Sequence, residues 1–282
     1  MRCDHHIHMV LDGTDWKAAI RRHEAGPDVA YIRTILARYQ KQGFIYLRDG
    51  GDRWGVGAAA RALAGEYGIV YRTPLAPLCM AGHYGSFIGQ TYTNLKEYAA
   101  LVGQIRQQGG DFIKIMISGL MDFSRPGVLT EEGLPPAIIR ELIHIAHEEG
   151  FRVMAHANGA KTVAAAAEAG VDSVEHGAYL NRDALQTMAD CGTVWVPTLS
   201  TVGNLRGKGR FPEAAVRAIL DRAMENVAQF AAMGGLLAPG SDAGAWAVAH
   251  GTLSEYELLA ACLGANASEI LERGSQTIRE RF

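Results

Sequence analysis

The feature that most restricts the fold of this chain is a glycine that recurs immediately before short apolar runs. The first junctions are Gly43 before FIYL and Gly68 before IVY. The later ones are Gly110 before DFIKIMI, Gly150 before FRVMA, Gly170 before VDSV, Gly192 before TVWV and Gly235 before LLAPG. Each glycine follows a segment rich in Ala, Leu, Glu, Arg and Gln, as a left-handed residue that ends a helix does. Each junction therefore predicts a helix followed by a strand.

The apolar runs and the segments between them predict the fold class. The runs are apolar on both faces, which is typical of parallel strands covered by helices, and the segments between them are long enough to be crossover helices. The N-terminal MRCDHHIH supplies an eighth strand. Eight alternations predict a single closed (β/α)₈ TIM barrel, with a doubly wound open sheet as the main alternative. The length of 282 residues agrees with this fold, since such barrels typically have about 250.

One domain is expected over residues 1–282, because no Pro- or Ser-rich linker divides the chain. The segment from about Thr252 to the end predicts helices. Long non-helical stretches are predicted after several strands, at residues 75–93, 118–134, 197–210 and 243–251. Barrel enzymes keep their active sites in the loops of this face, so we expect the functional residues there.

Composition excludes several classes of protein. Hydrophobic residues make up 48% of the chain and charged residues 20%, which predicts an ordinary globular protein. Lys+Arg 27 against Asp+Glu 30 gives a net charge of -3, and the chain lacks a basic run that could bind nucleic acid. The cysteines form no CxxC pair, which argues against a disulfide framework and for a reducing compartment. Without a signal sequence or an apolar span, a cytoplasmic protein with no membrane partner is expected; the sequence leaves a homo-oligomer open.

Several polar residues lie inside or at the ends of the predicted strands. His6 and His8 alternate by two, so both imidazoles should point to the same side of the first strand, and Asp4 should share that side. An HxH pair alone is a weak signal, but four further polar residues occupy equivalent places. They are Lys114 within FIKIMI, His156 in FRVMAH, His176 in VDSVEH and Asp242 in LLAPGSD.

A shared partner is needed to explain these buried polar residues, because burying an unpaired charge costs several kcal/mol. Neutral imidazoles and carboxylates suit zinc and similar divalent ions. Two ions would also explain Lys114, since a desolvated lysine has a lowered pKa and can react with carbon dioxide to form an anionic carbamate that bridges them. An ion pair of Lys114 with Asp4 or Glu175 is an equally good reading of the spacing.

The chain resembles the amidohydrolase superfamily, in particular its imidazolonepropionase-like and prolidase-like branch. The resemblance extends over nearly the full length and rests on DHHIH, DFIKIMISG, VMAHANG, VDSVEHG and PGSDAG in this order. It implies that His6, His8 and Asp242 hold one metal ion, that His156 and His176 hold the other, and that carboxylated Lys114 bridges them. It also implies that a metal-bridging hydroxide attacks a carbonyl while Asp242 takes its proton and passes it to the leaving group. The chain lacks the flanking β-sandwich segments of many relatives, which leaves the subfamily open.

The sequence therefore predicts a metal-dependent hydrolase that cleaves a C–N bond in a small amide, cyclic amide or dipeptide. A lactone or ester hydrolase with the same site, and a catalytically idle barrel that binds metal, are the alternatives. Zinc is the expected metal, with iron, manganese and nickel also compatible. A dinucleotide-binding oxidoreductase is disfavoured, because GDRWGVGAAAR lacks the GxGxxG spacing.

Five further residues are candidates for substrate contact, each with an ordinary structural alternative. Arg48, at the end of the second strand, could pair with a substrate carboxylate or form an internal ion pair with Asp49 or another barrel residue. The remaining candidates, which could equally be loop or rim residues, are His83, Tyr84, Tyr179 and Trp246.

Overall fold

The computed structural model describes residues 2–282, and the strands among them form two parallel sheets. The first sheet has the order β1 (Arg2–Ile7), β2 (Phe44–Asp49), β3 (Val70–Arg72). The second has the order β10 (Leu236–Leu237), β9 (Val194–Val196), β8 (Ser173–His176), β7 (Val153–Ala157), β6 (Ile113–Met116), β4 (Leu78–Met80), β5 (Gln90–Tyr92). The neighbouring strands pair in parallel, which requires a crossover between successive strands.

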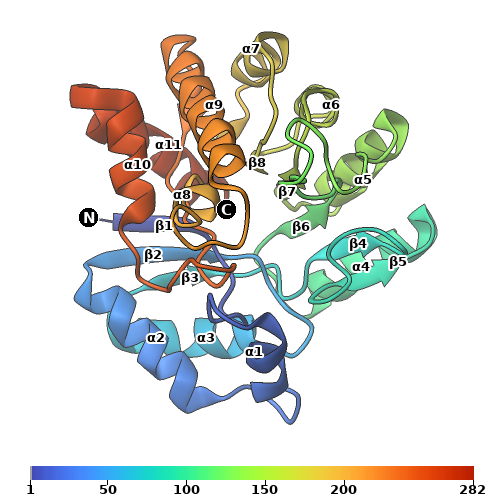
Figure 1. The fold of residues 1–282 in the computed structure, drawn as a ribbon. Helices are drawn as coiled ribbons and strands as arrows, with labels where there is room; N and C mark the ends of the chain where they lie inside the picture. Colours follow the sequence, from blue (N-terminus) through green and yellow to red (C-terminus); the bar gives the residue numbers. More distant parts are fainter. Residues whose placement is uncertain (1) are drawn as a thin grey trace.

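Helices supply most of these crossovers, and Figure 1 shows them around the outside of the strands. Asp28 and Asn94 cap the first turns of α2 and α4 by accepting from the backbone N–H of Tyr31 and Glu97. The helices are α1 (Trp16–Arg22), α2 (Val29–Lys41), α3 (Val56–Ala64), α4 (Leu95–Gln107), α5 (Pro136–Glu148), α6 (Ala160–Glu168), α7 (Arg182–Asp190), α8 (Ser200–Gly203), α9 (Glu213–Ala232), α10 (Ser254–Leu263) and α11 (Ala267–Arg281). No helix of residues 2–282 has the length and apolar character needed to cross a membrane.

The parallel α/β fold predicted from the glycine junctions is confirmed, and each of the expected apolar runs contains a strand. The stretch 75–93 is non-helical as predicted, but it contains the strands β4 and β5, which were not predicted. The prediction was wrong at 197–210, where the short helix α8 lies. At the two Gly-Gly pairs the left-handed residue is the first glycine, Gly109 or Gly234, instead of Gly110 or Gly235. A Cβ on Gly110 would lie 2.4 Å from the side chain of Ile105, so close packing explains the second glycine.

The apolar core contains a cluster to which both sheets contribute. Cys3 of β1 and Tyr46 of β2 pack with Met154 of β7 and Val194 of β9. Phe282, at the end of the chain, belongs to the same cluster. The inner faces of the two sheets therefore share one apolar layer, and the polar residues of the candidate site lie beyond it along the same strands.

Candidate metal centre

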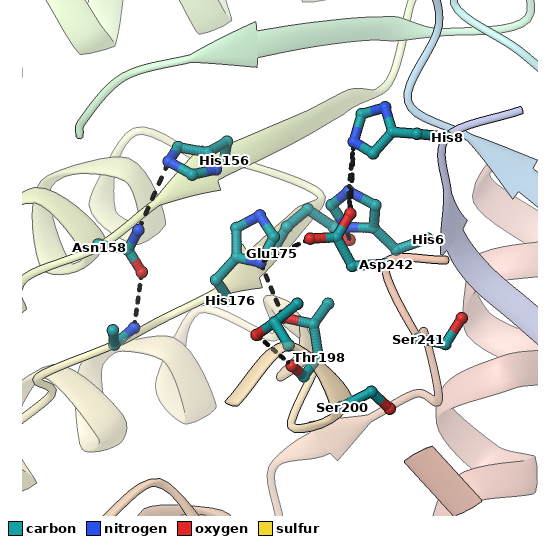
Figure 2. Close-up of polar contacts among 12 residues, drawn as sticks. His6, His8, His156, Asn158, Glu175, His176, Thr198, Ser200, Ser241 and Asp242 are labelled. Carbon is teal, nitrogen blue, oxygen red and sulfur yellow. Dashed lines mark hydrogen bonds and ion pairs between the residues drawn. The ribbon is translucent and has the colours of Figure 1, made fainter. Parts of the chain in front are cut away.

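All six residues predicted as metal ligands line one cavity of about 810 Å³. They come from five strands or strand ends far apart in the sequence, and Figure 2 shows five of them close together. The six are His6, His8, Lys114, His156, His176 and Asp242. The expectation that the carboxyl ends of the strands gather these side chains agrees with this geometry.

His6, His8 and Asp242 form the tightest group. The Nε2 atoms of His6 and His8 lie 3.4 Å apart, and Oδ1 of Asp242 lies 3.5 Å from the first and 3.4 Å from the second. Within residues 2–282 these three side chains meet the spacing expected of a metal-ion site. Figure 2 shows them pointing toward one another.

His156 and His176 lie beside this group with their rings 4.6 Å apart. His176 is also 4.9 Å from the ring of His6, and its Nδ1 lies 2.7 Å from Oγ1 of Thr198. Nε2 of His156 lies 3.2 Å from the carbonyl oxygen of Gly119. His176 therefore keeps Nε2 available to a ligand. In His156, Nε2 can donate to the Gly119 carbonyl, which leaves Nδ1 as the nitrogen available to a ligand.

Lys114 is completely buried, and its amine has no hydrogen-bond partner among the described residues. The ion pair with Asp4 or Glu175 that the sequence left open is therefore not formed at contact distance. Burial lowers the pKa of Lys114, although the carboxylates of Glu175 and Asp242 act in the opposite sense. The neutral amine is the form that could attack carbon dioxide and lose a proton to give a carbamate, or donate its lone pair to a metal ion.

Backbone geometry at the strand ends places His176 and Asp242. Both residues have a positive φ, 68° and 57°, which residues other than glycine rarely adopt. Hydrogen bonds from the N–H of Asp242 to the carbonyl of His6 (2.7 Å) and from the N–H of His8 to the carbonyl of Ala243 (2.7 Å) fix the Asp242 segment beside β1.

The expectation that Asp4 shares the face of His6 and His8 was wrong. A register irregularity lies between Asp4 and Ile7 in β1, so the alternation breaks there. The Asp4 carboxylate instead accepts from the N–H and hydroxyl of Ser241 at 2.8 and 2.6 Å. Asp4 thereby holds the residue that precedes Asp242.

Burial sets the charge state of the site. Desolvation lowers the pKa of His8 and of His156 to about 3 and holds the pKa of His6 and His176 well below the usual range. The imidazoles are therefore neutral at pH 7, as metal ligands must be. The same desolvation raises the pKa of Asp242.

Arg48 does not line the cavity; it is fully buried below the histidines. Its guanidinium donates to Oε1 of Glu175 (2.8 Å), to the Ser173 hydroxyl (2.9 Å) and to the carbonyl of His5 (2.8 Å). Each of the three guanidinium nitrogens thus donates to a buried acceptor, so the side chain is not placed to contact a substrate. The internal ion pair is the arrangement observed, with Glu175 in place of Asp49.

The other candidate substrate contacts divide into two pairs. Tyr84 and Trp246 line the cavity, and the Tyr84 ring lies 4.8 Å from the ring of His156. His83 and Tyr179 are outside its lining. His83 pairs with Glu131 of the next loop, and Tyr179 faces a separate cavity of about 30 Å³ beside His176, so neither is placed for the predicted contact.

The sequence did not predict the contacts that hold the histidines or most of the cavity wall, and it indicated Glu175 only as a possible partner of Lys114. Thr198 and Asn158 contact His176 and His156, and Glu175 lies 2.7 Å from Nδ1 of His6. The signal was present for Glu175, since VEH is part of a predicted ligand motif, but strict alternation would direct Glu175 away from His176. The aromatic wall also includes Trp16, Phe87, Phe123 and Phe211.

The chain shares its parallel α/β fold with solved structures named as a Xaa-Pro dipeptidase, an amidohydrolase and ochratoxinase, and the resemblance predicted from the sequence is confirmed at the level of the fold. A Xaa-Pro dipeptidase with methionine bound in its active site superposes with a TM-score of 0.77 and 20% identity, over 98% of this chain and 74% of that one. Ochratoxinase of Aspergillus niger superposes with a TM-score of 0.76 and 19% identity, over 98% and 70%. At these identities the likeness shows the fold alone.

Sequence comparison finds more limited similarity. An uncharacterised protein of Mycobacterium tuberculosis is 31% identical over 140 residues, which cover 48% of this chain and 38% of that protein. Ochratoxinase of Aspergillus niger is 24% identical over 187 residues, 63% of this chain and 33% of that enzyme. The aligned part thus spans well under half the length of these curated relatives. No protein-family model matches the chain.

Proposed function

We propose that this protein is a metal-dependent hydrolase that cleaves a C–N bond of a small amide, cyclic amide or dipeptide. The observation that carries the proposal is the gathering of His6, His8, Lys114, His156, His176 and Asp242 around one cavity. The dipeptidase and ochratoxinase whose fold the chain shares are hydrolases by name, which supports the same class of activity here.

The residues present fit a divalent ion. Ligand atoms at about 2.1 Å from a tetrahedral zinc ion are about 3.4 Å apart, and the three closest atoms of His6, His8 and Asp242 are separated by 3.4 to 3.5 Å. Oδ1 of Asp242 and Nζ of Lys114 are buried atoms without a hydrogen-bond partner among the described residues. Buried polar atoms of this kind call for a partner, and a cation satisfies the carboxylate and the neutral nitrogens together.

We assign His6, His8 and Asp242 to one ion, His156 and His176 to a second, and Lys114, as its carbamate, to both. Zinc is the preferred metal for this set of nitrogen and oxygen ligands, with iron, manganese or nickel as substitutes. When bound, such ions lower the pKa of water and polarise a substrate carbonyl.

Asp242 is the residue proposed to move the proton. Its carboxylate lies among three histidine rings, with Oδ2 4.0 Å from Nδ1 of His176. Burial raises the pKa of Asp242 in the metal-free chain. A carboxyl at this place could take a proton and pass it to a leaving amine. The neutral histidines around it cannot compete for that proton at pH 7, because burial keeps their pKa values low.

The cavity wall indicates an apolar part in the substrate. Aromatic and aliphatic side chains line most of it, with Phe123 stacked on Phe211 at 4.3 Å. Tyr84 and Trp246 are therefore proposed to contact this apolar part, as the sequence suggested. A volume of about 810 Å³ suits a small molecule or dipeptide.

We further propose that the two sheets close into one (β/α)₈ barrel and that residues 1–282 are a single domain. The N–H of His5 donates to the carbonyl of Pro239 (2.9 Å), which joins β1 to the end of β10. The N–H of Asp111 donates to the carbonyl of Thr73 (2.9 Å), which joins the end of β3 to the start of β6. Both open edges of the smaller sheet are thus linked to the larger one.

The test is a substrate screen of the purified protein supplied with zinc or manganese. N-acyl amino acids, dipeptides, cyclic amides and lactones are compared, with metal content measured on the same sample. Cleavage of an amide or dipeptide is the expected result. Activity on lactones alone would overturn the C–N assignment, and full loading with metal without any hydrolysis would favour the idle barrel.

A further inference from the structure

The ring of His6 contacts the buried carboxylate of Glu175, which is not itself a predicted metal ligand. Oε2 of Glu175 lies 2.7 Å from Nδ1 of His6, and both side chains are completely buried. The other carboxylate oxygen, Oε1, accepts from Arg48 at 2.8 Å and from the Ser173 hydroxyl at 2.7 Å. Glu175 is therefore held on one side by a cation and presents its remaining oxygen to the imidazole.

We propose that Glu175, held by Arg48, is the positioning residue that sets the tautomer of His6 and thereby the metal affinity of the site. This inference rests on the proposed function. A carboxylate paired with a guanidinium is anionic and can only accept, so Nδ1 of His6 must carry the ring proton. Nε2 then has its lone pair free, and it is Nε2 that faces His8 and Asp242 at 3.4 and 3.5 Å. Carboxylate–histidine pairs of this kind orient metal ligands and raise their basicity.

The arrangement is specific to His6 among the histidines of the cavity. His176 and His156 contact the neutral oxygens of Thr198 and Gly119. The Thr198 hydroxyl can donate or accept, so it does not dictate which ring nitrogen of His176 carries the proton. The Gly119 carbonyl can only accept, so it favours a proton on Nε2 of His156, but it carries no full charge. The guanidinium of Arg48 also lies over the ring of Phe282, 4.5 Å from its centroid. Phe282 therefore helps to hold Arg48, and with it the Glu175 carboxylate, in place.

Glu175→Gln tests the assignment because it reverses one hydrogen bond without changing size. The Arg48 guanidinium needs an acceptor, so the amide oxygen should turn to it and the amide N–H₂ should face His6. Nδ1 of His6 then has to accept, and the proton moves to Nε2. Nitrogen-15 NMR of the metal-free protein should show His6 protonated at Nδ1 in the unaltered chain and at Nε2 in the variant.

Metal affinity is the second measurement, made by competition for zinc with a chromogenic chelator. We expect Glu175→Gln to weaken zinc binding about 10- to 100-fold. Glu255→Gln is the matched control: Glu255 is equally buried and accepts from the N–H and hydroxyl of Ser200 at 2.7 and 2.8 Å, but it is outside the cavity lining. The control should bind zinc as the unaltered chain does.

A double variant keeps the test decisive if Glu175→Gln does not fold. Arg48→Met with Glu175→Leu removes both charges together, which is often nearly neutral for stability, and it should show the same loss of zinc affinity. Unchanged affinity or an unchanged His6 tautomer in a folded Glu175 variant would overturn the positioning role. An equal loss in Glu255→Gln would overturn it too. If the unaltered chain binds no divalent metal, the proposed function itself fails.

Discussion

Asp242→Asn separates proton transfer from metal binding. The amide keeps an oxygen that can occupy the place of Oδ1, 3.4 Å from Nε2 of His8 and 3.5 Å from Nε2 of His6. It cannot take up and release a proton in the way that the buried carboxyl, with its raised pKa, can. A general acid or base contributes about 10²- to 10⁴-fold to a rate, which corresponds to about 3 to 5 kcal/mol of transition-state stabilisation.

We therefore expect kcat to fall at least about 100-fold in Asp242→Asn, while elemental analysis finds most of the metal still bound. Steady-state hydrolysis of the best substrate from the screen is the assay. Asp52→Asn is the control and should leave kcat unchanged. Asp52 is also buried, but its carboxylate accepts from the N–H of Gly57 at 2.8 Å, in the first turn of α3. A metal-loaded Asp242→Asn enzyme with unaltered kcat would refute the assigned role.

Three other substitutions test separate parts of the reasoning. Lys114→Ala should lower the number of metal ions per chain measured by elemental analysis, and two ions at full occupancy would count against the bridging role. The pKa of His250 is lowered by burial to about 4 from an ordinary 6.5, so between these values the unfolded chain binds more protons and stability falls as pH falls. His250→Gln should remove up to about 3 kcal/mol of that acid sensitivity, measured by urea unfolding at pH 7 and 4.5, and an unchanged difference would refute the sign. In Gly274→Ala a Cβ would lie 1.9 Å from the carbonyl oxygen of Leu237, so folding should be lost or thermal stability sharply lowered, whereas Gly103→Ala, with open space around it, should fold normally.

The sequence predicted the strands and their polar ends because both depend on local pattern. A glycine before each apolar run is a short-range signal, and His6, His156 and Asp242 interrupt or end those runs visibly. Parallel strands bring their carboxyl ends to one edge regardless of the residues between them. The ligand set could therefore be proposed before any geometry was known.

The hydrogen-bond partners of those residues come from segments far apart in the sequence. The local sequence pattern does not indicate which of these segments meet. Arg48 is 127 positions from Glu175, and its direction was undecidable between a substrate and an internal partner. Asp4 was misplaced because a register irregularity in β1 breaks the alternation on which the inference relied. The strand β4 was missed for a related reason, since LCM lies within a long loop and gains its pairing from β5 and β6.

The buried polar groups of the strands form two layers, here called the lower and the upper tier. The two tiers differ in how far their hydrogen bonds are satisfied, and this difference indicates where a ligand binds. In the lower tier, Arg48, Ser173 and Glu175 satisfy one another through hydrogen bonds of 2.7 to 2.9 Å. In the upper tier, Lys114 and Asp242 keep buried polar atoms that the described residues do not satisfy. Buried polar atoms without a partner also occur at His5 and Tyr46, but Lys114 and Asp242 line the cavity. Leaving their polar atoms unpaired costs stability unless a ligand binds there. The upper tier is therefore built for a group from outside the chain, and the lower tier is built to hold it in shape.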